Sequence, residues 1–201
     1  MSTLTLDSNI VGNRNISQSN KSGIHPLKFI LWLLIVSSIM LFSAFTSAYI
    51  VRKGEGNWRI VDLPIELWYS TVFIVISSVT IQLSLYYSQK QDLIKARTYF
   101  LSSFVLGLLF LYTQYRSFGA LVDSKFFFSY DNPASSFVYI LIGVHAFHLL
   151  FGLVFLLIVL FTIFKKNNSI NLLRFELCTT YWHFLDAVWV YLFFFLIIYH
   201  K

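Results

Sequence analysis

Polar residues with the types and spacing needed for chemistry lie in the C-terminal third of the chain. His145 and His148 are three residues apart, so on a helix they share one face. A second group falls within about a third of a helix circumference, at about 100° per residue. It consists of Glu176, Thr179, Thr180, His183 and Asp186. If these faces belong to adjacent helices, we expect them to meet.

Four interpretations of these residues compete. His145, His148, Glu176 and His183 offer ligand types suited to zinc or iron, as in a membrane metalloenzyme. The other three are a proton or ion pathway, a lipid head-group site, and a hydrogen-bonded network that fixes two helices. The chain has five histidines, too few for a multi-histidine di-iron enzyme, and no charged residue continues a pathway deep into the preceding apolar runs. We favour the structural network, which is compatible with lipid binding.

Nucleophilic and cysteine-based chemistry find no support in the chain. There is no Gly-x-Ser-x-Gly motif and no glycine-rich phosphate loop. Cys178 is the single cysteine, which excludes an internal disulfide and a four-cysteine zinc site held by this chain alone. Its position at a helix end favours a packing role.

The elements that must position the polar residues are apolar runs of transmembrane length. The 201 residues are 57% hydrophobic and only 12% charged, about half the roughly 25% typical of soluble domains. A spanning helix needs roughly 20 apolar residues. The sequence therefore predicts an all-α integral membrane protein, a single five-helix domain over 23–201 behind a flexible tail, 1–22. The predicted spans are 27–51, 67–87, 98–115, 137–164 and 178–198.

The distribution of basic residues predicts the orientation of these spans. Nine Lys and Arg lie in the N-terminal tail and the second and fourth loops, against six on the other side. Because basic residues resist translocation, this bias predicts a cytoplasmic N-terminus and an external C-terminus. The scattered basic residues form no stripe, so we expect no nucleic-acid partner.

Small and polar residues within the spans predict where the helices pack, because lipid tails offer no hydrophobic gain for burying leucine. Gly152 lies on the face of His145 and His148, where a neighbouring helix could approach closely. The other predicted packing residues are Ser43, Ala44, Ser47 and Ala48 in the first span, Ser70, Ser77, Thr80 and Ser84 in the second, and Ser103, Gly107 and Gln114 in the third.

Two linked motifs give the chain a family resemblance. The first is Gly143-Val-His145-Ala-Phe-His148-Leu-Leu-Phe-Gly152; a basic loop, Glu176 and Tyr181-Trp182-His183-Phe184-Leu185-Asp186-Ala187-Val188-Trp189 follow. This ordered pair resembles subunit III of the haem-copper terminal oxidases, in its short five-helix bacterial form. Weaker matches are Thr71, Ser77 to Thr80, Gln114 and Ser135-Ser136-Phe137, so the resemblance covers about residues 25–200.

The resemblance implies a subunit of an oxygen-reducing, proton-pumping complex of the bacterial cytoplasmic membrane. This chain would hold no haem or copper, which belong to partner subunits. It would pack against subunit I, accompany subunit II and small subunits, and support turnover and proton uptake. Membership of a respiratory supercomplex is left open by the resemblance. Phospholipid would bind in a cleft between the first two helices and the remaining bundle. We expect cytochrome c as electron donor, with a quinol oxidase as the alternative.

On this resemblance no residue is catalytic, cofactor-binding or metal-binding. The residues expected in a structural polar cluster with lipid head-group contacts are His145, His148, Glu176, Trp182, His183, Asp186 and Trp189. Two positions depart from the family pattern. Ser38 stands where many members have a carboxylate after Ser37, and Ser117 stands where a Glu is usual. The resemblance therefore gives no basis for carrying over to this chain a proton-related role of the acid at the Ser38 position.

Overall fold

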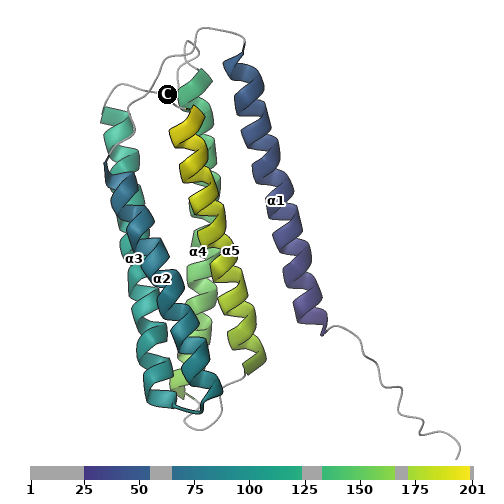
Figure 1. The fold of residues 1–201 in the computed structure, drawn as a ribbon, viewed down its shortest axis with the longest axis vertical. Helices are drawn as coiled ribbons and strands as arrows, with labels where there is room; N and C mark the ends of the chain where they lie inside the picture. Colours follow the sequence, from purple (N-terminus) through teal and green to yellow (C-terminus); the bar gives the residue numbers. More distant parts are fainter. Residues whose placement is uncertain (1–24, 55–64, 124–132, 166–171, 200–201) are drawn as a thin grey trace, which may run out of the picture.

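The computed structural model describes residues 25–54, 65–123, 133–165 and 172–199, which are helical apart from short caps and turns (Figure 1). The helices are α1 (Pro26–Lys53), α2 (Glu66–Gln89), α3 (Leu93–Asp123), α4 (Pro133–Lys165) and α5 (Leu172–Tyr199). Each contains a stretch long and apolar enough to cross a membrane. The predicted all-α five-span class is thus confirmed, whereas the predicted tail, 1–22, lies outside the described residues.

The helix ends follow from local chemistry. Pro26 starts α1 at a position where its missing N–H costs nothing, and Nδ1 of His25 accepts a bond from the backbone N–H of Leu27. Between α2 and α3, Gln91 has a φ of 64°, the left-handed conformation that a tight turn requires. Asp92 then caps α3, accepting from the backbone N–H of Lys95. The hydrogen bonds and charge of Lys95 lower the pKa of this exposed carboxyl.

All five helices extend beyond the predicted spans, and α3 and α5 do so most. The third span, predicted as 98–115, lies in a helix that runs from Leu93 to Asp123, and the fifth begins at Leu172 instead of residue 178. Charged residues at the ends of α3 and at Arg174 and Glu176 interrupt the apolar pattern. They do not interrupt the helical hydrogen bonds, so the apolar run underestimates helix length wherever a helix leaves the hydrocarbon layer.

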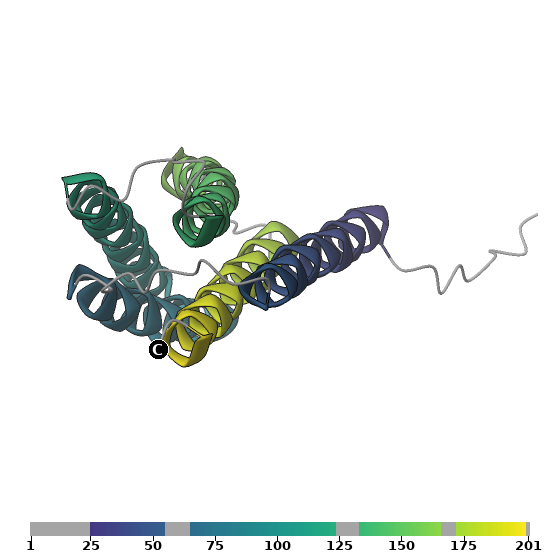
Figure 2. The same cartoon turned by 90° about the horizontal axis from the view of Figure 1, so that it is seen from above.

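α5 is the central helix of the bundle. It packs against α1, α2 and α4, and it is the most buried of the five spans (Figure 2). α2 and α3 form an antiparallel hairpin, and α1 stands at the opposite edge, with its N-terminal half leaning away from the bundle (Figure 1). The described parts of α1 and α2 make no close backbone approach. A cleft between a pair formed by these two helices and the remaining bundle, as the resemblance implied, is therefore wrong for this chain.

The predicted packing faces are correct for α2 and α3 and wrong for α1. Ser70, Ser77, Ser84, Ser103 and Gln114 are buried. In α1, by contrast, all four predicted residues are exposed, namely Ser43, Ala44, Ser47 and Ala48. The buried face of α1 instead carries Ile35, Ser38, Phe42, Thr46 and Tyr49. The small residues of α1 do not mark its buried face, because aromatic side chains fill the wide space between α1 and its neighbours.

Candidate functional site

The centre of the bundle is a hydrogen-bonded junction of α2, α3 and α5. Nε1 of Trp182 donates to Oγ of Ser77 at 3.0 Å, and the Ser77 and Ser103 hydroxyls lie 3.0 Å apart. The Trp182 ring covers Gly107, where an added Cβ would lie 2.7 Å from Cη2 of the indole. The glycine therefore gives the tryptophan its space. All four residues lie in the polar pattern or the motifs identified from sequence, but their mutual contact was not predicted.

Two further motif residues of α5 also bond to α2. Nε1 of Trp189 donates to Oγ1 of Thr71 at 3.1 Å. His183 uses both ring nitrogens, with Nδ1 2.7 Å from Oγ of Ser78 and Nε2 3.0 Å from Oε1 of Gln82. Trp189 and His183 thus lock α5 to α2, where sequence reasoning expected a partner on α4.

His145 is enclosed by aromatic rings. Its side chain is 1% exposed, and neither ring nitrogen has a hydrogen-bond partner among the described residues. The imidazole centroid lies 5.2 Å from the Trp189 ring, and 6.2 Å from those of both Phe42 and Phe110. This histidine therefore acts as a packing element that joins α4 to α1, α3 and α5.

His148 lies nearer the edge of the bundle and is partly exposed. Its Nδ1 is 2.8 Å from the Val144 carbonyl oxygen of its own helix, and the Tyr181 hydroxyl reaches the His148 carbonyl at 3.4 Å. One turn on, a Cβ at Gly152 would lie 2.6 Å from Cδ1 of Leu185. The predicted close approach of a neighbouring helix at Gly152 is confirmed, and that helix is α5.

Glu176 tethers the outlying helix. Its Oε2 lies 3.3 Å from Nζ of Lys28, across the gap between α1 and α5. Nearer the C-terminal ends of the same two helices, Oγ1 of Thr46 and the Tyr191 hydroxyl are 3.0 Å apart. Sequence reasoning treated Lys28 only as a topology signal. Its pairing could not be predicted, because nothing in the sequence indicates which helix stands beside α1.

The predicted meeting of polar faces on α4 and α5 is correct only for the α4 face, which meets α5 at Trp189 and Leu185. The α5 residues divide between α1 and α2, and the two histidines of α4 make no side-chain hydrogen bond to them. Thr180 bonds only to the Glu176 carbonyl of its own helix. Buried Thr179 and Asp186 have no hydrogen-bond partner among the described residues, although the Ser78 hydroxyl lies beside Asp186. A central helix has neighbours on most sides, so an arc of one third of its circumference faces more than one of them.

The metal-site alternative fails on geometry. His145 lies among aromatic rings, Glu176 pairs with Lys28, and His183 is bonded to α2. In the ranges that the structure describes, no three His, Cys, Asp or Glu side chains are close enough to hold one ion. These residues do not fit a metal centre shared between α4 and α5.

A groove, here called the α1 groove, separates the N-terminal half of α1 from α4 and α5. Its volume is about 670 Å³. Leucines, isoleucines and phenylalanines make most of its lining, and the polar lining residues are His148, Thr162, Arg174 and Tyr181. Arg174 and the Lys28–Glu176 pair lie at the same end, because α1 and α5 run parallel (Figure 1). The groove thus combines an apolar trough with cationic groups at one membrane face.

The two serines that replace usual family acids both face the interior. Ser38 is 4% exposed and bonds to the Leu34 carbonyl oxygen, and Ser117 is 2% exposed and bonds to that of Thr113. Each hydroxyl is satisfied within its own helix. Neither position carries a charge or a bond to another helix.

Comparison with known proteins gives a consistent result. The family model for cytochrome c oxidase subunit III matches residues 4–201. The chain is 29% identical to cytochrome c oxidase subunit 3 of Bacillus sp. (strain PS3), over 81% of this chain and 80% of that one. It is 30% identical to the same subunit of Alkalihalophilus pseudofirmus, over 81% of each. It is 25% identical to the probable quinol oxidase subunit 3 of Staphylococcus saprophyticus, over 93% and 92%. With nearly its whole length matched, the chain belongs to the cytochrome c oxidase subunit III family of haem-copper oxidases.

Proposed function

We propose that this chain is a non-catalytic scaffold subunit of a proton-pumping haem-copper oxidase, with haem and copper held by its partners. It packs against subunit I, accompanies subunit II and small subunits, and sustains turnover and proton uptake. Cytochrome c is the proposed electron donor.

The use made of the motif side chains supports this scaffold role. The ring nitrogens of Trp182, Trp189 and His183 all hydrogen-bond to side chains of α2. The ring of His145 packs against other aromatic rings. An axial haem ligand needs a ring nitrogen free to face the iron. The imidazole of His145 is surrounded by other rings, and both nitrogens of His183 are engaged. This use of the motif side chains supports a role in holding the bundle together.

The α1 groove supports phospholipid as the molecule bound at this site. Arg174 offers a guanidinium suited to a phosphate, and the trough beyond it offers acyl chains an apolar surface. Lys28 adds positive charge at the same end, although it is partly neutralised by Glu176. The proposed ligand is a phospholipid of the leaflet on the N-terminal side of α1. Given the basic-residue bias, that side is the cytoplasm and the C-terminus is external.

A quinol oxidase is the second candidate. The observation in its favour is coverage, because the staphylococcal quinol oxidase subunit aligns with more of this chain than the two cytochrome c oxidase subunits do. Oxygen consumption by the purified complex, measured with reduced cytochrome c and separately with a quinol, distinguishes the two.

Two substitutions test the scaffold role in the assembled complex. Glu176→Gln removes the ion pair to α1, and His148→Ala removes a lining residue of the α1 groove. We expect both to leave the initial rate of oxygen reduction unchanged and to shorten the time over which turnover lasts. Glu66→Gln removes a carboxylate at the other membrane face and is the control. It should change neither the initial rate nor the time over which turnover lasts. An immediate stop of oxygen reduction in a complex that keeps every subunit and cofactor would refute the scaffold role.

A further inference from the structure

One side of the bundle, formed by α2 and α5, exposes a matched pair of residue stripes. The two helices lie along this side of the molecule, and α4 lies on the other side of α5 (Figure 2). Exposed residues recur at seven-residue intervals, close to two helical turns, so each helix carries one stripe. The stripes are Trp68, Val75 and Gln82 on α2, and Thr180, Ala187 and Phe194 on α5. We call this surface the α2–α5 seam.

Contacts between α2 and α5 place the two stripes side by side. Near one end Trp68 packs against Phe193, with ring centroids 4.9 Å apart, and near the other end Gln82 bonds to His183. The helices run antiparallel, so the middle residues of the stripes lie at about the same level. The seam is thus aromatic at one end, lined by smaller side chains in the middle and polar at the other end.

Gln82 presents unpaired hydrogen-bond donors on this surface. Its Oε1 can only accept, so it takes the N–H of His183 Nε2 at 3.0 Å. Its own Nε2 carries two N–H groups and has no hydrogen bond to any described residue. Gln82 lies eight residues before Lys90 at the end of α2, about 12 Å along the helix and inside the hydrocarbon layer. An unpaired N–H group at that depth is costly, because lipid tails cannot accept a hydrogen bond.

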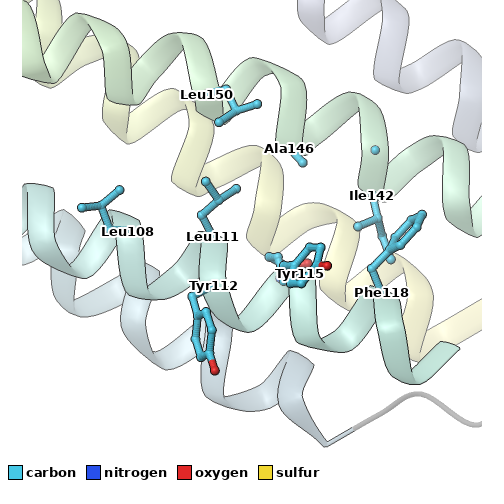
Figure 3. Close-up of a pocket in the computed structure, with 10 residues that line it drawn as sticks. Leu108, Leu111, Tyr112, Tyr115, Phe118, Ile142, Ala146 and Leu150 are labelled. Atoms are coloured by element: carbon cyan, nitrogen blue, oxygen red, sulfur yellow. The ribbon is translucent and has the colours of Figure 1, made fainter. Parts of the chain in front are cut away.

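Other exposed surfaces of the bundle do not share this feature. The hydroxyls of Thr98 and Thr180 donate to carbonyl groups one turn back in their own helices. The surface between α3 and α4 exposes mainly leucine and aromatic side chains, among them Leu108 and Leu150 (Figure 3). Lipid tails cover leucine without cost. The amide of Gln82 therefore distinguishes the α2–α5 seam from a surface that lipid tails alone can cover.

The missing acceptor has to come from a molecule that carries an oxygen at this depth. The ester and phosphate oxygens of lipids stay at the interface. A transmembrane helix can present a side-chain oxygen at any depth, and such interhelical hydrogen bonds hold helices together in membranes. Ala187, in the middle of the seam, is small enough to let the backbone of such a helix approach closely.

We propose that the α2–α5 seam docks one transmembrane helix of another oxidase subunit, which presents a side-chain oxygen to Nε2 of Gln82. The inference rests on the proposed function, because it takes another subunit of the complex as the partner. His183 is a positioning residue here. By holding Oε1 of Gln82, it turns the two amide N–H groups toward the partner.

Two exposed valines give matched positions for a photo-cross-linker. Val75 lies on the seam and is 47% exposed, and Val154 on α4 is 53% exposed. Val154 is nine residues from buried His145, which places it on the opposite face of α4, away from the bundle. Benzoylphenylalanine is introduced at each position in the assembled oxidase in nanodiscs, and the cross-linked peptides are identified by mass spectrometry. We expect Val75 to cross-link to a transmembrane peptide of another subunit at roughly tenfold higher yield than Val154.

Substitutions then test the contacts. Ala187→Leu should reduce the fraction of this chain that stays with the complex in rising detergent, and Ala44→Leu, at an exposed alanine of α1, should not. Gln82→Leu should lower the ratio of bound to free chain roughly 3- to 20-fold, the worth of one interhelical hydrogen bond. The decrease should persist in a His183→Phe background, where the internal bond is already absent.

The outcomes separate this inference from the proposed function. A complex without haem-copper subunits would overturn the proposed function. A complex with every subunit, in which Val75 labels only lipid or a second copy of this chain, would overturn the docking seam alone. Equal yields at Val75 and Val154, or equal effects of the two alanine substitutions, would do the same. Loss of the Gln82→Leu effect in the His183→Phe background would overturn the hydrogen bond to the partner.

Discussion

Ser77→Ala should weaken the three-helix junction more than any other serine substitution on α2. The hydroxyl accepts from Trp182 at 3.0 Å and lies 3.0 Å from the Ser103 hydroxyl. It also lies 3.2 Å from the Ser103 carbonyl oxygen. Alanine removes all of these contacts and leaves the indole N–H of Trp182, which is 1% exposed, without an acceptor. No other acceptor bonds to this indole among the described residues, so the loss cannot be made good by a neighbour.

The size of the effect follows from these contacts. Interhelical hydrogen bonds in membranes are worth about 0.6 to 1.7 kcal/mol each. Orphaning a buried donor costs about 1 to 3 kcal/mol. We therefore expect the free energy of unfolding to fall by about 1 to 3 kcal/mol. For a chain of this size, each kcal/mol lost lowers the melting temperature by about 2–4 °C.

Cys178 provides the assay. It is the chain's single cysteine and is 1% exposed on α5, so a thiol reagent labels it when the bundle opens. Labelling of its peptide in the heated, purified oxidase is read by mass spectrometry. Ser47→Ala, the same change on the exposed face of α1, is the control. The quantity compared is the temperature at which half of Cys178 is labelled. If this temperature is the same for Ser77→Ala and Ser47→Ala, the junction does not stabilise the bundle. In a double-mutant cycle, the effects of Ser77→Ala and Trp182→Phe on this temperature should not add, because both substitutions remove the same hydrogen bond.

Three further predictions rest on single contacts. Gly152→Leu should destabilise the bundle by about 1 to 3 kcal/mol, since Leu185 already fills that space, and the same thermal labelling of Cys178 measures it, with Gly119→Leu unaffected. Lys28→Ala breaks the same ion pair as Glu176→Gln, so it should likewise shorten the time over which turnover lasts. It should lower the melting temperature by no more than about 2–4 °C, because the pair is partly exposed and worth less than about 1 kcal/mol; a larger drop would contradict this. Asp92→Ala should speed amide exchange at the start of α3 at neutral pH. The lowered pKa of Asp92 means that its stabilisation exists above the usual Asp range and is lost as pH falls through the lowered value. In strong acid the variant and wild type should therefore exchange alike.

The sequence predicts the spans and the inner faces of α2 and α3 because both depend on local periodicity. Apolar runs locate the five helices, and the seven-residue spacing of Ser70, Ser77 and Ser84 identifies a face that is buried. Gly152 was predicted correctly for the same reason, since a small residue in a spanning helix permits close packing whatever the neighbour is.

The partners of the polar side chains depend on which helices are neighbours, and periodicity does not contain that information. His183 and Trp189 were assigned to an α4–α5 cluster, yet both bond to α2 because α5 lies at the centre of the bundle. The buried face of α1 was misassigned because Phe42 and Tyr49 fill the space beside α4 and α5 with ring contacts, which small-residue packing would exclude. Only the arrangement of helices determines these two features.

Isolation of the native complex from its membrane tests the central claim most directly. Subunit identification should find this chain together with haem-copper subunits I and II, and a redox difference spectrum should show haem in the complex. The same spectrum of the isolated chain should show none, since His145 is packed among aromatic rings and His183 is bonded to α2. Stoichiometric haem in the isolated chain, or a complex without a haem-copper subunit, would contradict the account.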